Sequence, residues 1–147
     1  MIPSTARIHL ATIIPYESGT GVTVLGTPMR SASDYAYIKD VIERVLESHR
    51  DTCRSLKLLP DGQIQLHLLR RCLSACKLQH LLRSTECAVL PELLSRADMI
   101  IRDTLHSIVG GHVSINQWQQ ARLGIREGGL GIQTPGDVVD PARLAAI

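Results

Sequence analysis

The chain has 147 residues, 44% of them hydrophobic, so it is long enough for one globular domain with a core and is not a disordered tail. The formal net charge of +2 at pH 7 is too small to indicate a nucleic-acid partner by itself. Four cysteines without a secretory signal predict reduced thiols in an intracellular protein, nuclear or cytoplasmic. We expect no membrane span, because the longest charge-free run, residues 104–121, contains histidines, glutamines and glycines.

The first 30 residues have a pattern typical of strands. Two runs rich in β-branched residues, Ala6–Ile14 and Gly21–Leu25, flank a polar, turn-forming connector at residues 15–20. This pattern predicts a β-hairpin. Because a lone hairpin is only marginally stable in water, it needs either helices of this chain or a sheet absent from it to pack on.

From Ser31 the apolar period becomes helical, and Ser31 with Asp34 has the spacing of a capping box. The apolar stripe of this first helix consists of Ile38, Val41, Ile42, Val45 and His49. A strong breaker at residues 59–62 ends it. Asp61 can then cap a continuous helix over residues 63–82.

Three more helices are expected before the end of the chain. Pro91, which is tolerated at a first helical position, opens a helix that ends at the glycines Gly110 and Gly111. Ser114 caps a short helix whose apolar side chains are Ile115, Trp118 and Ala121. A last helix is expected after Pro141.

A glycine-rich stretch, residues 123–132, precedes that last helix. Gly128 and Gly129 can take positive φ, and the apolar residues on both sides of them alternate. The stretch therefore predicts two short extended pieces around a tight turn. These residues alone indicate that the turn has a structural role rather than a functional one.

The predicted fold class is mainly α. Residues 1–30 form the N-terminal β-hairpin, residues 31–122 a small antiparallel helical bundle, and residues 123–147 the Gly-rich turn and C-terminal tail.

Charge is concentrated in residues 51–83. This segment has six basic side chains against Asp51 and Asp61, which gives a local charge of +4. The second predicted helix contains no Asp or Glu, and its basic side chains are Arg70, Arg71, Lys77 and Arg83. Such a helix can follow phosphates without distinguishing bases, with Arg70 and Lys77 two turns apart on one face and Arg71 pointing elsewhere. The alternative is an ordinary solvated helix face.

Cysteine and histidine spacing offers a competing hypothesis. Cys72, Cys76 and His80 recur every four residues, and His49 with Cys53 repeats that spacing. Two such pairs could hold a zinc ion. The structural alternative, which we favour, is that small cysteines pack one helix against another, so we expect no metal.

Four short strings, in order along the chain, match a known family. They are Leu25–Pro28 (LGTP), Leu68–Cys72 (LLRRC), Leu81–Ser84 (LLRS) and Arg126–Ile132 (REGGLGI). These strings resemble the LG-x-P, LLR-x-C, LLR-T and REGGLGL strings of reverse transcriptases from non-LTR, LINE-type retrotransposons. The resemblance covers residues 22–147 and implies the thumb and following linker, which in the family grip the template–primer duplex.

The resemblance also implies RNA-directed DNA synthesis for the parent enzyme. That chemistry needs two carboxylates to hold a metal pair, which the family supplies from an Asp-Asp turn in its palm. The sequence contains no Asp-Asp pair, so we expect a non-catalytic fragment without a cofactor.

The expected partner is an RNA/DNA duplex, contacted through phosphates by Arg70, Lys77 and Arg83, with Arg71 a weaker contact. Two alternatives belong to other classes. One is a helical protein-interaction module that binds a missing palm or self-associates through an orphaned apolar face. The other is a retrotransposon remnant without a function. A zinc-stabilised domain is a third possibility.

Overall fold

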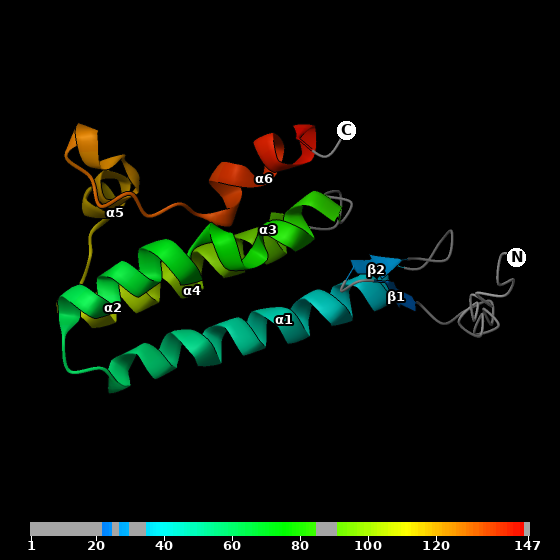
Figure 1. The fold of residues 1–147 in the computed structure, drawn as a ribbon, viewed down its shortest axis with the longest axis horizontal. Helices are drawn as coiled ribbons and strands as arrows, with labels where there is room; N and C mark the ends of the chain where they lie inside the picture. The colour runs from blue at the N-terminus through cyan, green and yellow to red at the C-terminus, as the bar shows by residue number, and fades with distance from the viewer. Residues whose placement is uncertain (1–21, 25–26, 30–34, 85–90, 146–147) are drawn as a thin grey trace, which may run out of the picture.

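The computed structural model describes residues 22–24, 27–29, 35–84 and 91–145, and within these ranges the chain is mainly helical, as predicted (Figure 1). The helices are α1 (Ala36–Ser55), α2 (Gly62–Leu68), α3 (Ala75–Ser84), α4 (Pro91–Val109), α5 (Ile115–Arg122) and α6 (Pro135–Leu144). Short 3-10 turns occupy Leu56–Leu58 and Ile125–Glu127, and a π-helical segment occupies Leu69–Leu73.

Two short strands precede α1. Strand β1 (Val22–Val24) pairs antiparallel with β2 (Thr27–Met29), with Val22 opposite Met29. The expected hairpin paired residues 21–25 with residues 6–14, and this partner strand lies outside the described residues. That prediction therefore stays untested.

The apolar side of α1 follows the expected helical period. Its buried residues are Ile38, Ile42, Leu46, His49 and Cys53, which recur every three or four positions. Val41 and Val45, which were expected in the same stripe, are only half-buried at its edge. The expected cap at Ser31 lies outside the described residues. Tyr35 occupies the N-cap position of α1 without a side-chain capping bond.

Helix α4 is the central element of the bundle. It contacts α1, α2 and α6, and its buried face comprises Leu93, Ala97, Ile100, Ile101, Thr104 and Leu105. Ion pairs join Lys39 to Glu92 and Glu43 to Arg96, so residue numbers rise together along α1 and α4. These two helices are therefore parallel. Helices α2 and α3, which lie between α1 and α4 in the sequence, run antiparallel to both (Figure 1).

The expected continuous helix over residues 63–82 is wrong. Asp61 does cap α2, because its carboxylate accepts from the N–H groups of Gln63 and Ile64 at 2.7 and 3.2 Å. The helix is nevertheless interrupted at Ser74, where ψ is −147°. There the N–H of Ala75 donates to the carbonyl of Gln133 at 3.0 Å. In a continuous helix this N–H would donate to a carbonyl of the preceding turn, whereas here its acceptor belongs to the C-terminal tail.

Helix α5 begins with a reciprocal cap. The Ser114 hydroxyl and the Gln117 amide cap each other's backbone N–H groups, as the expected cap at Ser114 requires. Of the three apolar side chains expected on this helix, Trp118 and Ala121 are buried, whereas Ile115 is 66% exposed. The last helix begins at Pro135, before Pro141.

The signal for that earlier start is local, in Thr134-Pro135-Gly136-Asp137. The N–H and hydroxyl of Thr134 both donate to the Asp137 carboxylate, and Pro135 occupies the first helical position. Partial burial would raise the pKa of Asp137, but hydrogen bonds from Arg122 and Thr134 outweigh it and lower that pKa. This carboxylate therefore joins α5 to the start of α6.

The glycine-rich stretch folds back over the end of α5. The N–H groups of Leu130 and Ile132 both donate to the carbonyl of Ala121, at 3.2 Å each, and satisfy the end of that helix. Gly128 has the positive φ expected of it, at 80°. The expected pair of extended pieces is wrong, because Ile125 lies in a 3-10 turn and is 56% exposed.

Gly129 is required for a steric reason rather than for positive φ. A Cβ atom there would lie 2.1 Å from the carbonyl oxygen of Leu123 and 2.6 Å from that of Gln120. We predict that Gly129→Ala lowers the free energy of unfolding by about 3 kcal/mol, because backbone atoms rather than flexible side chains must move. Chemical denaturation followed by circular dichroism measures this change.

Gly111→Ala is the matched control, because a Cβ at Gly111 meets no atom within 4 Å and its φ is not positive. Its free energy of unfolding should stay within about 0.5 kcal/mol of the parent chain. Equal losses for the two variants would show that the loop does not hold Gly129 in this close contact.

Candidate nucleic-acid interface

The four basic residues singled out in the sequence lie in three different surroundings. Arg70 belongs to the π-helical segment, is half-buried, and lies against the glycine-rich loop. A Cβ added to Gly131 would come within 3.3 Å of the Arg70 Nε atom, so the absence of a side chain there lets the guanidinium approach the backbone. Arg70 and Ile125 together line the groove between α2 and this loop.

The other three are exposed, and two of them lie toward different neighbours of α3. Lys77 Nζ lies 3.4 Å from the Thr52 hydroxyl on α1, whereas an Arg83 nitrogen lies 3.5 Å from the carbonyl of Ala145, after α6. Since α1 and α6 lie on opposite sides of α3 in Figure 1, the structure does not gather Arg70, Lys77 and Arg83 into one row. The shared face expected for Arg70 and Lys77 assumed a regular helix, and the break at Ser74 removes that regularity.

Charge compensation distinguishes these residues from six other basic residues of the described ranges. Within the described ranges, no carboxylate lies within ion-pair distance of Arg70, Arg71, Lys77 or Arg83, because α2, the π segment and α3 contain no Asp or Glu. In contrast, carboxylates pair with Lys39, Arg44, Arg50, Arg54, Arg96 and Arg122. Among the described residues, four cations without a carboxylate partner therefore lie on the α2–α3 side, and Lys57, Arg102 and Arg126 elsewhere in the fold also have none.

A second basic region, which we call the α1–α4 cleft, lies between α1 and α4. It has a volume of about 210 Å³, and its lining side chains are Arg50, Cys53, Arg54, Lys57, Arg96, Met99, Ile100, Asp103 and Thr104. Arg54 and Lys57 belong to the basic segment of residues 51–83, but the sequence predicts no site here. The spacing of Arg50, Arg54 and Lys57 (i, i+4, i+7) is a signal for one helix face, whereas nothing local points to Arg96.

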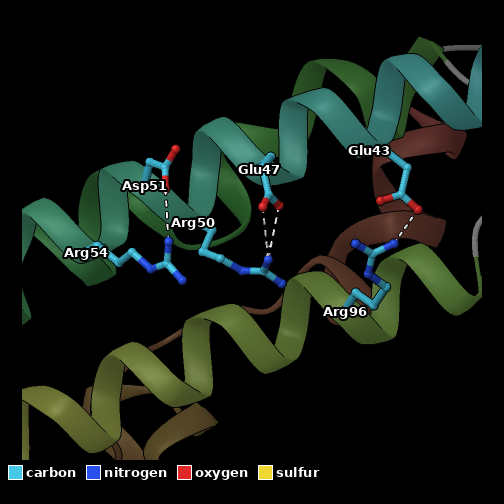
Figure 2. Close-up of polar contacts among 6 residues, drawn as sticks. All are labelled: Glu43, Glu47, Arg50, Asp51, Arg54 and Arg96. Carbon is cyan, nitrogen blue, oxygen red and sulfur yellow. Dashed lines mark hydrogen bonds and ion pairs between the residues drawn. The ribbon is translucent and has the colours of Figure 1, made fainter.

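Ion pairs border this cleft along α1 (Figure 2). One Arg50 nitrogen donates to both Glu47 oxygens at 3.0 and 3.3 Å, and one Arg54 nitrogen donates to Asp51 at 3.3 Å. Arg96 crosses from α4 to pair with Glu43, and this hydrogen bond lowers the pKa of Glu43. The two exposed pairs, Arg50 with Glu47 and Arg54 with Asp51, each contribute only about 0–1 kcal/mol.

His49 and Cys53 are both buried, and Cys53 also lines the cleft. Their side chains are 3.8 Å apart, and His49 Nδ1 has no hydrogen-bond partner among the described residues. Cys72 and Cys76, by contrast, are exposed. In the part of the chain that the structure describes, no group of three or more potential ligands could hold a metal ion, so the spacing behind the zinc hypothesis does not create a site there.

Comparisons of the chain with protein-family models, with curated proteins and with solved structures found no match. Among the described helices, none is both long and apolar enough to cross a bilayer.

His49 makes folding pH-dependent. Burial, with a smaller effect from nearby Lys77, lowers the pKa of His49 from 6.5 to about 4. In the unfolded chain, His49 therefore binds a proton as the pH falls through 6.5. In the folded chain it binds that proton only near pH 4. Stability from this residue is complete above pH 6.5 and should fall by about 3 kcal/mol as the pH drops to 4.

Urea unfolding at several pH values, compared with His49→Leu, measures this contribution as the difference between the two pH profiles. The variant should lack the decline that begins near pH 6.5. His67→Leu provides the control, because His67 is exposed and its removal should leave the profile of the parent chain. Identical profiles for the parent chain and His49→Leu would contradict a buried neutral His49.

Proposed function

We propose that this chain is a thumb-like, non-catalytic fragment of a LINE-type reverse transcriptase that binds nucleic-acid duplexes through their phosphates. The observation that carries the proposal is the uncompensated positive charge of the α2–α3 side, where Arg71, Lys77 and Arg83 are exposed without a carboxylate partner among the described residues. The four ordered strings that resemble this family support it. An RNA–DNA hybrid is the expected duplex.

The physical basis is counterion release. Each Lys or Arg that neutralises a phosphate displaces a condensed cation from the duplex, so affinity falls as salt rises. Side chains spread over several neighbours can contact successive phosphates, but they do not identify bases. We therefore expect binding to be sequence-independent and steeply salt-dependent.

The absence of catalysis in the proposal follows from the sequence. Nucleotide transfer by this family needs a carboxylate pair in the palm, and the chain has no Asp-Asp pair. The chain would therefore bind a duplex without catalysing nucleotide transfer.

We predict that Arg71→Ala with Lys77→Ala weakens hybrid binding and lowers the slope of log affinity against log salt by about 2, one for each lost phosphate contact. Fluorescence anisotropy of a labelled RNA–DNA hybrid across a NaCl series measures both quantities. These two residues are preferable to Arg70, whose packing against the loop would confound its removal.

Lys39→Ala with Arg44→Ala is the matched control. It also removes one Lys and one Arg, but both of these pair with carboxylates, Glu92 and Asp40. Its slope should stay close to that of the parent chain. If both double variants changed the affinity and the salt slope equally, the loss of net charge alone would explain the result. That outcome would contradict a role for the α2–α3 side.

A second candidate function, self-association or binding of a missing palm, is favoured by large apolar side chains on the surface. Leu58 is 84% exposed, Leu144 is 73% exposed and Ile115 is 66% exposed. We predict that, if this function dominates, the purified chain dimerises with concentration in sedimentation experiments without nucleic acid. A monomer at all concentrations would contradict self-association.

A further inference from the structure

We infer that the groove between α2 and the glycine-rich loop, which we call the α2–loop groove, binds an acidic peptide segment of another protein. In this arrangement Arg70 holds a carboxylate of the peptide. An aliphatic side chain next to that carboxylate packs against Leu66, Ile125 and Leu130. The groove has a volume of about 330 Å³. The inference goes beyond duplex binding, because none of the three exposed cations that carry that proposal lines the groove.

Arg70 gives the groove its preference for an acid. Among the described residues that line the groove, it is the one permanently charged side chain, and none is a carboxylate. Arg70 is half-buried against the backbone at Gly131, yet within the described ranges its guanidinium forms no hydrogen bond and no ion pair. A guanidinium packed in this way is already restricted before binding, and its planar set of donors fits a carboxylate bidentately.

The apolar side chains of the groove favour a peptide over a nucleic acid. On the loop side, Ile125 is 56% exposed and Leu130 is 37% exposed, and Leu66 is half-buried on the α2 side. An aliphatic side chain placed among them would remove this apolar surface from water. The phosphates and sugars of a nucleic acid are polar, and its bases stack on Phe, Tyr or Trp, none of which is among the described lining residues.

The α2 side of the groove also offers contacts to a peptide backbone. Gln63 and His67 line this side, both are exposed, and neither side chain forms a hydrogen bond within the described residues. Each can both donate and accept, as the N–H and C=O groups of a peptide require. The N–H groups of Gly129 and Leu130, on the loop side, already donate within the chain. The backbone contacts are therefore expected on α2, and the apolar contacts mainly on the loop.

A second hollow of about 450 Å³ continues the groove beyond Arg70. Arg70 and Ile125 line both hollows, and Arg126 adds a second cation that has no carboxylate partner in the described structure. One acid, Glu127, also lies there, but its carboxylate accepts from the N–H of Gly124 at 3.0 Å. The balance of charge along both hollows is positive, which complements an acidic peptide rather than a basic one.

The probe for this groove comes from a selection of random displayed peptides on the purified full chain. We expect the selected peptides to share an Asp or Glu next to a Leu, Ile or Val. The tightest of them is then synthesised with a fluorescent label, together with a form in which the amide replaces its acid. In anisotropy titrations the acidic peptide should bind about tenfold more tightly than the amide peptide, because a charge-assisted hydrogen bond is lost in the latter.

Two variants of the chain test the role of Arg70. Arg70→Gln should bind the acidic peptide about tenfold more weakly, and it should no longer distinguish the acidic peptide from the amide peptide. Gln63→Glu retains Arg70 and its packing but adds a competing carboxylate to the groove. It too should weaken the acidic peptide. The added acid lies in the first turn of α2, where the helix dipole favours it, so this variant should fold.

Arg83→Gln is the matched control for Arg70→Gln. Arg83 also has no carboxylate partner among the described residues, but it does not line the α2–loop groove. Its removal changes the net charge equally and should leave both the affinity for the acidic peptide and the preference for the acid unchanged. Thermal unfolding by circular dichroism checks that every variant retains the helical fold.

The outcomes separate the inference from the proposed function. Selected peptides without a shared acid, or equal binding of the acidic peptide by the parent chain and both groove variants, would overturn the inference. If no peptide is selected and Arg70→Gln instead weakens binding of the RNA–DNA hybrid, Arg70 is a phosphate contact, so the inference fails and the proposed function survives. If the acidic peptide binds as expected and the hybrid does not bind, the inference stands and the proposed function is overturned.

Discussion

The hydrogen bond from the Ala75 N–H to the Gln133 carbonyl joins the C-terminal tail to the middle of the bundle, and much of the structure depends on it. It ends the π-helical segment at Ser74 and lets α3 start in a new phase. The tail that supplies the carbonyl is itself fixed, because Ile132 and Thr134 are fully buried on either side of Gln133. Lys77, which follows this interruption, lies against Thr52 of α1.

Local signals made several elements predictable from the sequence, and the misses have a common cause. Asp61 and Ser114 start helices through hydrogen bonds within their own first turn, and Pro91 occupies a first helical position, where no N–H is needed. The sequence therefore contains the information for these three starts. The break at Ser74 depends on a carbonyl far downstream, which no local period reveals. The start of α6 at Pro135 is different, because its capping residues Thr134 and Asp137 are only three residues apart and form a local signal.

The candidate site likewise combines features that the sequence predicts with features that depend on the fold. The absence of acids around Arg71 and Lys77 was visible in the sequence, and in the described structure these cations do lack carboxylate partners. The α1–α4 cleft was not predictable, because it requires the register that places Arg96 of α4 beside Glu43 of α1. That register is set by the packing of buried faces, in which Ile42 and Ala97 both line one apolar pocket, rather than by the charges themselves.

The two basic regions would act differently on a duplex under the proposed function. Charges without a carboxylate partner project a field over about one Debye length, roughly 8–10 Å at physiological salt, so the α2–α3 side would attract a duplex before contact. Each compensated pair of the cleft has almost no field at that distance, because the carboxylate of Asp51 or Glu47 cancels the neighbouring guanidinium. The α1–α4 cleft would therefore contribute less to that attraction than the α2–α3 side, whose helices contain no acids.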